Sequence, residues 1–180
     1  IKDFGSFATT GDYWYDAARG DKVRADQEVD LGLTITIDEK NYKVIFAKSN
    51  LTKDGLAENE YDYGDYFAWG ATEPWYSSAT QTWKGDISGG YTVANAPYYN
   101  NGSYTEYRNK YDVLAASDDA ARHILGGDWQ IPIKEIWDKL YATSKYAWSW
   151  TSKGGYNGYQ VSNAVATKTL FLPAAGRVED

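Results

Sequence analysis

The stretch from Ser117 to Leu140, SDDAARHILGGDWQIPIKEIWDKL, predicts two short helices joined by a tight glycine turn. Ser117 is a good N-cap, and Asp118 and Asp119 follow it where the positive end of a helix dipole favours acids. The first helix carries a buried stripe at helical spacing and is expected to end at a left-handed glycine. The stripe consists of Ala121, Ile124 and Leu125, and the glycine is Gly126.

A short extended segment at Trp129 and Ile131 leads into the second helix. Pro132 suits the first turn of that helix, because the N–H that proline lacks would have no helical partner there. One helix face is apolar and the other is charged. The apolar face holds Ile133, Ile136, Trp137 and Leu140, and the charged face holds Lys134, Glu135, Asp138 and Lys139. We therefore expect this helical pair to be an internal brace of the fold rather than a catalytic region.

The composition limits the fold and the partners. A chain of 180 residues favours one domain, and 17 Tyr, 8 Trp and 5 Phe are typical of short strands with long ordered loops. The formal net charge of -7 argues against nucleic acid or an anionic membrane as partner, because both attract a basic surface. The chain has no cysteine, which excludes disulfides, zinc–thiolate sites and thiol nucleophiles, and it has no transmembrane run.

Period-two patterns predict two hairpins and a final strand. The first hairpin spans 29–48, with a turn at Glu39-Lys40-Asn41. In the second, the strand 146–150 returns through Gly154-Gly155 as the strand 156–163, and 169–176 is a last apolar strand. Five tryptophans outside the irregular stretch 71–110 are expected in the core, because burying large rings is strongly stabilising. They are Trp69, Trp129, Trp137, Trp148 and Trp150.

Residues 71–110 form an irregular stretch rich in Gly, Ser, Asn, Thr, Tyr and Trp. So long a stretch without periodicity is typical of a functional loop, and its rings are too many for a disordered linker. Tyr, Trp and Asn build adaptable binding surfaces and suit stacking on sugars. The candidate ligand-binding residues are Trp75, Tyr76, Trp83, Tyr98, Tyr99, Asn100 and Tyr104. The alternative is that these rings pin a long loop to its own domain.

Several blocks in fixed order carry a family resemblance over roughly residues 29–177. They are VDLGL (29–33), YGDYFAWGATEP (63–74), the stretch 117–137, WSWT (148–151) and FLPAAG (171–176). This pattern resembles the Fibrobacter succinogenes major paralogous domain, which is abundant in gut Bacteroidetes. The resemblance implies an α+β, C-type-lectin-like fold with two short helices, small antiparallel sheets and long ordered loops. It also implies a secreted or surface-anchored (lipoprotein) binding domain, akin to variable proteins diversified by retroelements.

The chain departs from the family pattern at three places. Ile133 stands where the family usually has Thr, and Tyr146 or a neighbour replaces a common Cys. The family continues beyond the Leu-Pro-Ala-Ala-Gly block with further strands, whereas this sequence ends at Asp180. We therefore expect a C-type-lectin-like domain over 29–180 without those C-terminal strands, preceded by an N-terminal segment or linker over 1–28.

No catalytic, metal or cofactor site is expected. His123 is the single histidine and has no nucleophile or orienting partner in a recognisable motif. The formylglycine-generating chemistry of related domains requires cysteine. Glu73-Pro74 is followed by Trp75 where a calcium ligand would carry an amide oxygen, and the acidic clusters lack EF-hand spacing. Arg19-Gly20-Asp21 is a tripeptide that some adhesion receptors recognise, with a solvated turn as the alternative reading.

The sequence thus predicts a non-enzymatic ligand-binding or adhesion module at the extracellular or outer-membrane surface. Recognition would use the aromatic and Asn-rich loops, with a protein or glycan ligand, without nucleic acid and without direct membrane insertion of this chain. The alternatives are a carbohydrate-binding lectin module and a structural pilus or surface-assembly subunit whose fold a donated strand completes.

Overall fold

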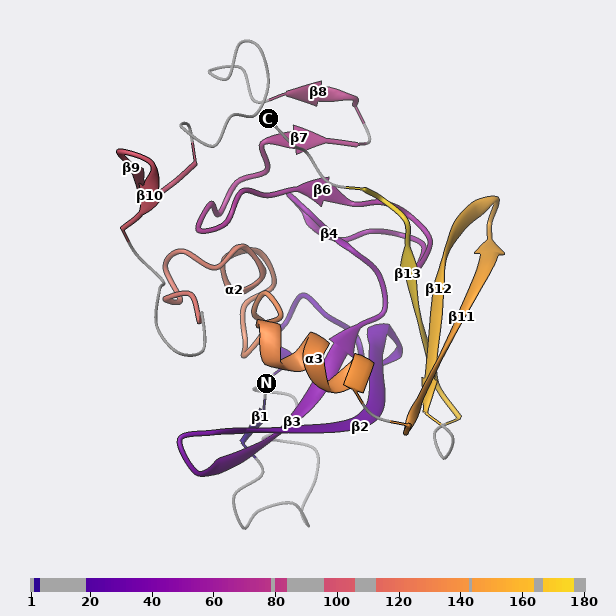
Figure 1. Cartoon of the computed structure of the whole chain (residues 1–180). Coiled ribbons are helices and arrows are strands. Elements are labelled where there is room, and N and C mark those ends of the chain that lie inside the picture. The colour runs from indigo at the N-terminus through magenta and orange to yellow at the C-terminus, as the bar shows by residue number, and fades with distance from the viewer. Residues whose placement is uncertain are drawn as a thin grey trace.

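A computed structural model shows a β-rich chain of small antiparallel sheets (Figure 1). It describes residues 2–3, 19–78, 80–83, 96–105, 113–142, 144–163 and 167–176. The expectation of an α+β C-type-lectin-like fold is wrong, because strands account for 39% and helices for only 14% of the residues that the structure describes, and one helix among them has seven or more residues. The physical reason is that Gly126 and Pro132 keep the two helices short. Strands with alternating apolar residues bury most of the core instead.

The described elements follow one another in this order. They are β1 (Lys2–Asp3), η1 (Ala25–Gln27), β2 (Glu28–Ile37), β3 (Lys40–Ala47), β4 (Leu51–Thr52), β5 (Gly55–Leu56), β6 (Asp65–Tyr66), β7 (Tyr76–Ser77), β8 (Thr82–Trp83), β9 (Tyr99–Asn100), β10 (Ser103–Tyr104), α2 (Ala120–Leu125), α3 (Lys134–Ala142), β11 (Tyr146–Lys153), β12 (Tyr156–Asn163) and β13 (Thr169–Pro173). Five sheets result in this part of the chain, and the largest contain three strands, ordered β1-β3-β2, β6-β7-β8 and β11-β12-β13.

The β2–β3 hairpin confirms the first period-two pattern. Leu31, Leu33 and Ile35 are buried on one side of β2, and their neighbours face outward. The predicted turn is displaced, because Ile37 pairs with Lys40 and the tight turn lies at Asp38-Glu39, both with positive φ. Asp38 tolerates this backbone region better than most other non-glycine residues do.

The helical stretch differs from expectation at its start. Asp119, not Ser117, is the N-cap of α2, and its carboxylate accepts a 3.0 Å hydrogen bond from the N–H of Arg122. Gly126 follows α2 with a positive φ of 73° but a ψ of -159°, so it is not a left-handed helical residue. Helix α3 begins at Lys134, two residues after Pro132. Its expected apolar face is confirmed, because Ile136 and Leu140 are buried.

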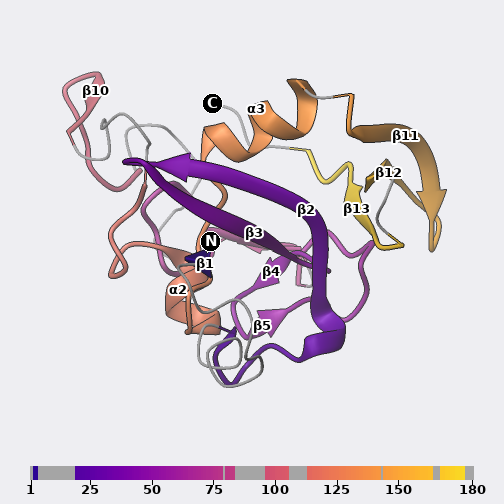
Figure 2. The same cartoon turned by 90° about the horizontal axis from the view of Figure 1, so that it is seen from below.

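Two apolar clusters meet along β3. Val44 and Phe46 belong to the larger cluster with β2, α3 and the β11–β13 sheet, whereas Ile45 belongs to a cluster with α2 and Trp129. Successive strand residues point to opposite sides, so β3 serves both clusters. Figure 2 shows this arrangement, with α3 and the β11–β13 sheet on one side of the hairpin and α2, β4 and β5 on the other.

The described residues within 1–28 pack onto the same body. Residues of β1 pair with Lys43 and Tyr42 of β3. Val23 is 4% exposed and lies in the cluster around α2.

The second predicted hairpin is confirmed as β11 and β12, with continuous pairing from Tyr146↔Asn163 to Lys153↔Tyr156. Its base lies in the core, where Tyr146 and Val161 are buried. Its far end extends beyond the core, and Trp150 is 57% exposed. The expectation that Trp150 is a core residue is therefore wrong, because the hairpin is longer than the layer that covers its inner side.

Candidate functional site

The loop residues predicted to bind a ligand pack largely against their own domain. Trp75 is buried in a small cluster with Ala96, against which Ala68, Ala71 and Tyr99 also pack. Tyr76 lies in β7, half-buried, with its ring edge-on to Tyr66 at a centroid distance of 5.6 Å. The structure thus brings Trp75 and Tyr99 together, but in the interior rather than on a surface.

The remaining predicted loop residues lie nearby. Tyr98 is 37% exposed, and its ring covers Gly70, where an added Cβ would meet it at 3.1 Å. Asn100 is exposed in β9, next to the turn at Asn101-Gly102 that leads into β10. Tyr104 and Trp83 lie in β10 and β8, and their side chains are outside the described part of the structure. Tyr98 and Asn100 are thus the exposed members of the set among those whose side chains the structure describes.

The tripeptide Arg19-Gly20-Asp21 is not displayed for a receptor. The Arg19 guanidinium binds the buried Glu28 carboxylate through two contacts, of 2.9 and 3.4 Å. The Arg19 side chain is only 14% exposed, and Gly20 packs so closely that an added Cβ would lie 2.9 Å from the backbone nitrogen of Gly127. Arg19 is therefore committed to an internal ion pair, and the solvated-turn reading applies to Asp21 alone.

Four aromatic rings form a continuous row on the β11–β12 hairpin and the end of α3, and we call this row the aromatic face. Its members are Tyr141, Trp148, Tyr159 and Trp150. Tyr141 stacks on Trp148 with ring centroids 4.3 Å apart, and Tyr159 lies edge-on to Trp148 and Trp150 at 5.7 and 4.9 Å. Tyr141 is 68% and Tyr159 is 42% exposed. The aromatic face therefore presents large rings to solvent in fixed relative orientations.

The aromatic face is held rigidly at the base of the hairpin. The indole N–H of Trp148 donates a 3.1 Å hydrogen bond to the carbonyl of Leu140, a buried residue of α3. Asn163 at the end of β12 donates a 2.7 Å bond to the carbonyl of Leu31 in β2. Burial raises the pKa of Tyr146, the first residue of β11, with a smaller contribution from Asp30. These contacts join the hairpin to the core.

The tip of the hairpin is also held. The ring of Tyr156 stacks on Tyr61 at 5.7 Å and meets Tyr63 edge-on at 5.1 Å. Lys153 forms a 2.6 Å ion pair with Glu60 in the same loop. A hairpin fixed at both ends keeps its exposed rings in place, which lowers the entropy lost when a ligand binds.

The hairpin is almost free of charge. Lys153 is the one charged residue of β11 and β12, and it is paired. On the side that carries Trp150 and Tyr159, the next cross-strand pair is Ser152 and Asn157, both exposed. The aromatic face is therefore flanked by neutral hydrogen-bonding groups, an arrangement that suits an uncharged polar ligand with apolar patches.

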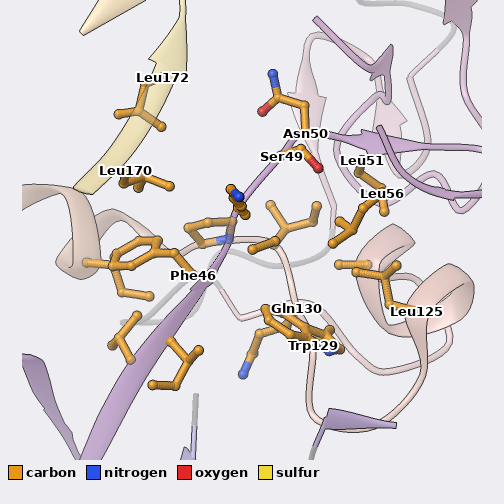
Figure 3. Close-up of a pocket in the computed structure, with 18 of the residues that line it drawn as sticks. Phe46, Ser49, Asn50, Leu51, Leu56, Leu125, Trp129, Gln130, Leu170 and Leu172 are labelled. Carbon is orange, nitrogen blue, oxygen red and sulfur yellow. The ribbon is translucent and has the colours of Figure 1, made fainter. Parts of the chain in front are cut away.

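A cavity of about 250 Å³ lies between the two apolar clusters. Figure 3 shows β13 on one side of it and the end of β3 with the following segment on the other. Most of its lining is apolar, with Phe46, Leu51, Leu56, Leu125, Leu170 and Leu172 among the contributing side chains. Ser49 and Asn50 line it as well, but their polar atoms donate to the carbonyls of Ala57, Asp62 and Tyr63. The cavity can accept apolar groups.

Asp119 is the buried acid of the helical stretch, only 2% exposed. One carboxylate oxygen accepts from Arg122 N, and the other accepts from Ile131 N at 2.8 Å. Burial raises the pKa of Asp119, and these backbone hydrogen bonds oppose the rise. Asp119 thus joins α2 to the segment before α3 and has a structural role. His123, the single histidine, is exposed to solvent.

Within the described ranges, no group of three or more His, Asp or Glu side chains is placed to hold a metal ion. In the same part of the chain, no helix is long and apolar enough to cross a membrane.

Sequence reasoning missed the aromatic face because it assigned Trp148 and Trp150 to the core. The sequence did contain a usable signal. Trp150 and Ser152 lie on the same side of β11, and the polar Ser152 is paired with the polar Asn157. A side that turns polar before the strand ends is a side that leaves the core. Tyr141 gave a weaker signal, as it falls just beyond the apolar stripe of its helix.

Comparison with known proteins adds no assignment. Scans against family models, curated proteins and solved structures found no match to this chain. The resemblance to the Fibrobacter succinogenes major paralogous domain therefore stays a prediction.

Proposed function

We propose that this chain is a non-catalytic binding module that recognises a neutral glycan through its aromatic face, at the extracellular surface that the family resemblance implies. One observation carries the proposal. Trp150 and Tyr159 of the aromatic face are 57% and 42% exposed on a hairpin that is fixed at both ends, and Tyr141, 68% exposed, extends the row from the end of α3. The ligand-contacting residues of this proposal are therefore on the hairpin and at the end of α3 rather than in the loops at 71–110.

The chemistry of the rings favours a sugar. The face of an aromatic ring is negative, and it attracts the slightly positive C–H groups that cover one side of a pyranose ring. Ser152 and Asn157, next to Trp150 and Tyr159, offer a hydroxyl and an amide for the sugar hydroxyls. Lys153, the one charged residue of these strands, is paired with Glu60, so an uncharged ligand would leave no unpaired charge buried on binding.

The size of the aromatic face favours a glycan over a folded protein. Its exposed rings offer a few hundred Å² of contact area. A stable protein interface buries about 800 Å² on each partner and usually includes arginine, which β11 and β12 lack. A glycan needs less area, and several copies of the module on one surface would raise its avidity.

The test is a glycan array probed with the multivalent chain, with and without EDTA. Trp150→Ala and Tyr159→Ala are expected to lower the signal at least tenfold, and EDTA is expected to leave it unchanged. Tyr98→Ala is the matched control, because Tyr98 in the loops and Tyr159 on the hairpin are similarly exposed, by 37% and 42%.

Three other results would indicate a different site, a different ligand or a wrong proposal. Loss of binding in Tyr98→Ala but not in Trp150→Ala would return the site to the loops. Binding to chemically deglycosylated mucin as strongly as to intact mucin would indicate a protein ligand. An array without any signal that depends on Trp150 would overturn the proposal.

A further inference from the structure

The longer edge strands of the described sheets differ in how they are protected. β2 has a register shift in its pairing with β3, and the carbonyls of Leu31 and Thr34 along it accept hydrogen bonds from the side chains of Asn163 and Lys139. β13 is covered within the molecule, because the residues at its middle are buried. Such measures keep a strand edge from pairing with another chain. β11 is different.

The outer edge of β11 is open. β11 pairs with β12 over all eight of its residues without a register shift, and among the described residues no strand pairs with its other edge. It is the outermost strand of its sheet in Figures 1 and 2, and Ser149, Trp150 and Thr151 along it are exposed. It contains no proline, and its one charged residue is Lys153, at its end. Every second residue therefore presents unpaired backbone groups to another strand.

Charge favours the same strand of a second copy as the occupant. The net charge of -7 makes two copies of the chain repel each other in general. β11 has no acidic residue, and Lys153 is bound in its ion pair with Glu60, so this edge is the place where two copies can approach without repulsion. Two identical antiparallel strands are related by a two-fold axis, which is the commonest symmetry of soluble oligomers.

Charge also selects the register of such a pair. The axis can pass through either of the two central residues of β11, Ser149 or Trp150. An axis at Ser149 would set Lys153 of each copy opposite Lys145 of the other, and like charges directly opposite are unfavourable. An axis at Trp150 sets Lys153 opposite Ala147 instead, and the two Trp150 rings become a cross-strand aromatic pair, which is favourable.

We propose that β11 strands of two copies pair antiparallel about Trp150 and join the two β11-β12-β13 sheets into one. The axis is perpendicular to the sheet, so the aromatic faces of both copies lie on the same side and meet at Trp150. Each copy thereby contributes rings to one longer binding platform. This use of the pair rests on the proposed function, whereas the pairing itself does not. Because two strands form a small interface, the dimer is weak and reversible.

Sedimentation velocity without any glycan tests the pairing. The wild type is expected to shift from monomer towards dimer between about 10 μM and about 1 mM. Ser149 of one copy lies opposite Thr151 of the other in the proposed register. The double variant Ser149→Lys, Thr151→Lys therefore sets lysines opposite lysines, and we expect it to associate at least tenfold more weakly.

The matched control keeps the first lysine and changes only its counterpart. In Ser149→Lys, Thr151→Glu each lysine faces a glutamate of the other copy, so association is expected to be at least as strong as in the wild type. Both positions lie on the side of β11 opposite Trp148 and Trp150, so the aromatic face is unchanged. Circular dichroism checks that both variants fold.

Two results would overturn the proposal. One is a wild-type sedimentation coefficient that stays constant up to about 1 mM. The other is equal association of the two double variants, because it would show that residues 149 and 151 do not face each other. The proposed function fails separately. A dimer without any glycan signal would overturn that function alone, and a monomer that binds glycans through Trp150 would overturn the pairing alone.

Discussion

The indole N–H of Trp129 donates a 2.8 Å hydrogen bond to the carbonyl oxygen of Arg19, which precedes it by 110 residues. The side chain of Arg19 in turn binds Glu28 at the start of β2. The turn after α2 is thereby joined to the first long hairpin. Because both contacts are largely shielded from water, this junction stabilises the fold more than a surface pair would.

Replacing Arg19 should destabilise the folded protein. Arg19→Ala leaves the Glu28 carboxylate buried without its partner, so we expect the free energy of unfolding to fall by about 3–5 kcal/mol. Arg24→Ala is the matched control, because Arg24 and its partner Asp26 are 70% and 71% exposed. The control should lose much less, because an ion pair between exposed side chains contributes little to stability. Urea denaturation measures both, and equal losses would contradict a buried role for Arg19.

Asp119 should give stability a measurable pH dependence. Because burial raises the folded-state pKa of Asp119 above its ordinary value of 3.8, its protonation favours the folded state. This contribution is fully present below about 3.8 and is lost as pH rises through the folded pKa. Asp119→Asn lacks the titration, so the stability of the wild type relative to this variant should fall over that window. Urea denaturation of both proteins from pH 3 upward measures the difference, and a constant difference would refute it.

Asp119→Ala should be less stable at every pH. It leaves the N–H groups of Arg122 and Ile131 without their acceptor, and we expect a loss of about 2–3 kcal/mol. Ser117→Ala is the control, because Ser117 is exposed and α2 begins later, at Ala120. A larger loss in Ser117→Ala than in Asp119→Ala would place the cap where the sequence alone suggested.

Replacing a buried tryptophan should cost more stability than replacing an exposed one. Trp129 is 9% exposed, and Trp129→Ala is expected to cost about 3–5 kcal/mol through a cavity and a lost hydrogen bond. Trp150→Ala should cost about 1 kcal/mol or less, since Trp150 loses mainly its edge-on contact with Tyr159. Thermal unfolding of the two variants makes the comparison. A loss at Trp150 that equals the loss at Trp129 would show that the aromatic face is covered in solution.

Substitutions of the two glycines at the hairpin tip, Gly154 and Gly155, should differ in their cost to stability. Both have positive φ, so each substitution by alanine strains the backbone. A Cβ on Gly154 would also lie 2.5 Å from the ring of Tyr61, whereas Gly155 has open space. Gly154→Ala is therefore expected to cost more than Gly155→Ala, by about 1–2 kcal/mol. It should also reduce the near-ultraviolet circular dichroism from the stacked Tyr61 and Tyr156, and equal spectra would contradict this.

Local pattern was sufficient for the elements whose partners are near in sequence. The alternation from Val29 to Ile37 predicted the β2–β3 hairpin, and Gly154-Gly155 predicted the turn between β11 and β12. The apolar stripe of α3 followed from its spacing. Local pattern did not predict the N-cap of α2 correctly. Ser117 and Asp119 are both good N-cap residues, and only the path of the backbone selects Asp119.

The sequence by itself therefore determined the hairpins, the amphipathic helix and a chain rich in polar and aromatic residues. Tertiary structure alone decided which aromatic residues are covered. Trp75 in an irregular loop is buried, and Trp150 in a regular strand is exposed, because burial depends on what packs above a residue rather than on its own pattern. Arg19 is a second example. The tripeptide Arg19-Gly20-Asp21 suggests an exposed receptor motif, but the fold buries the Arg19 side chain against Glu28.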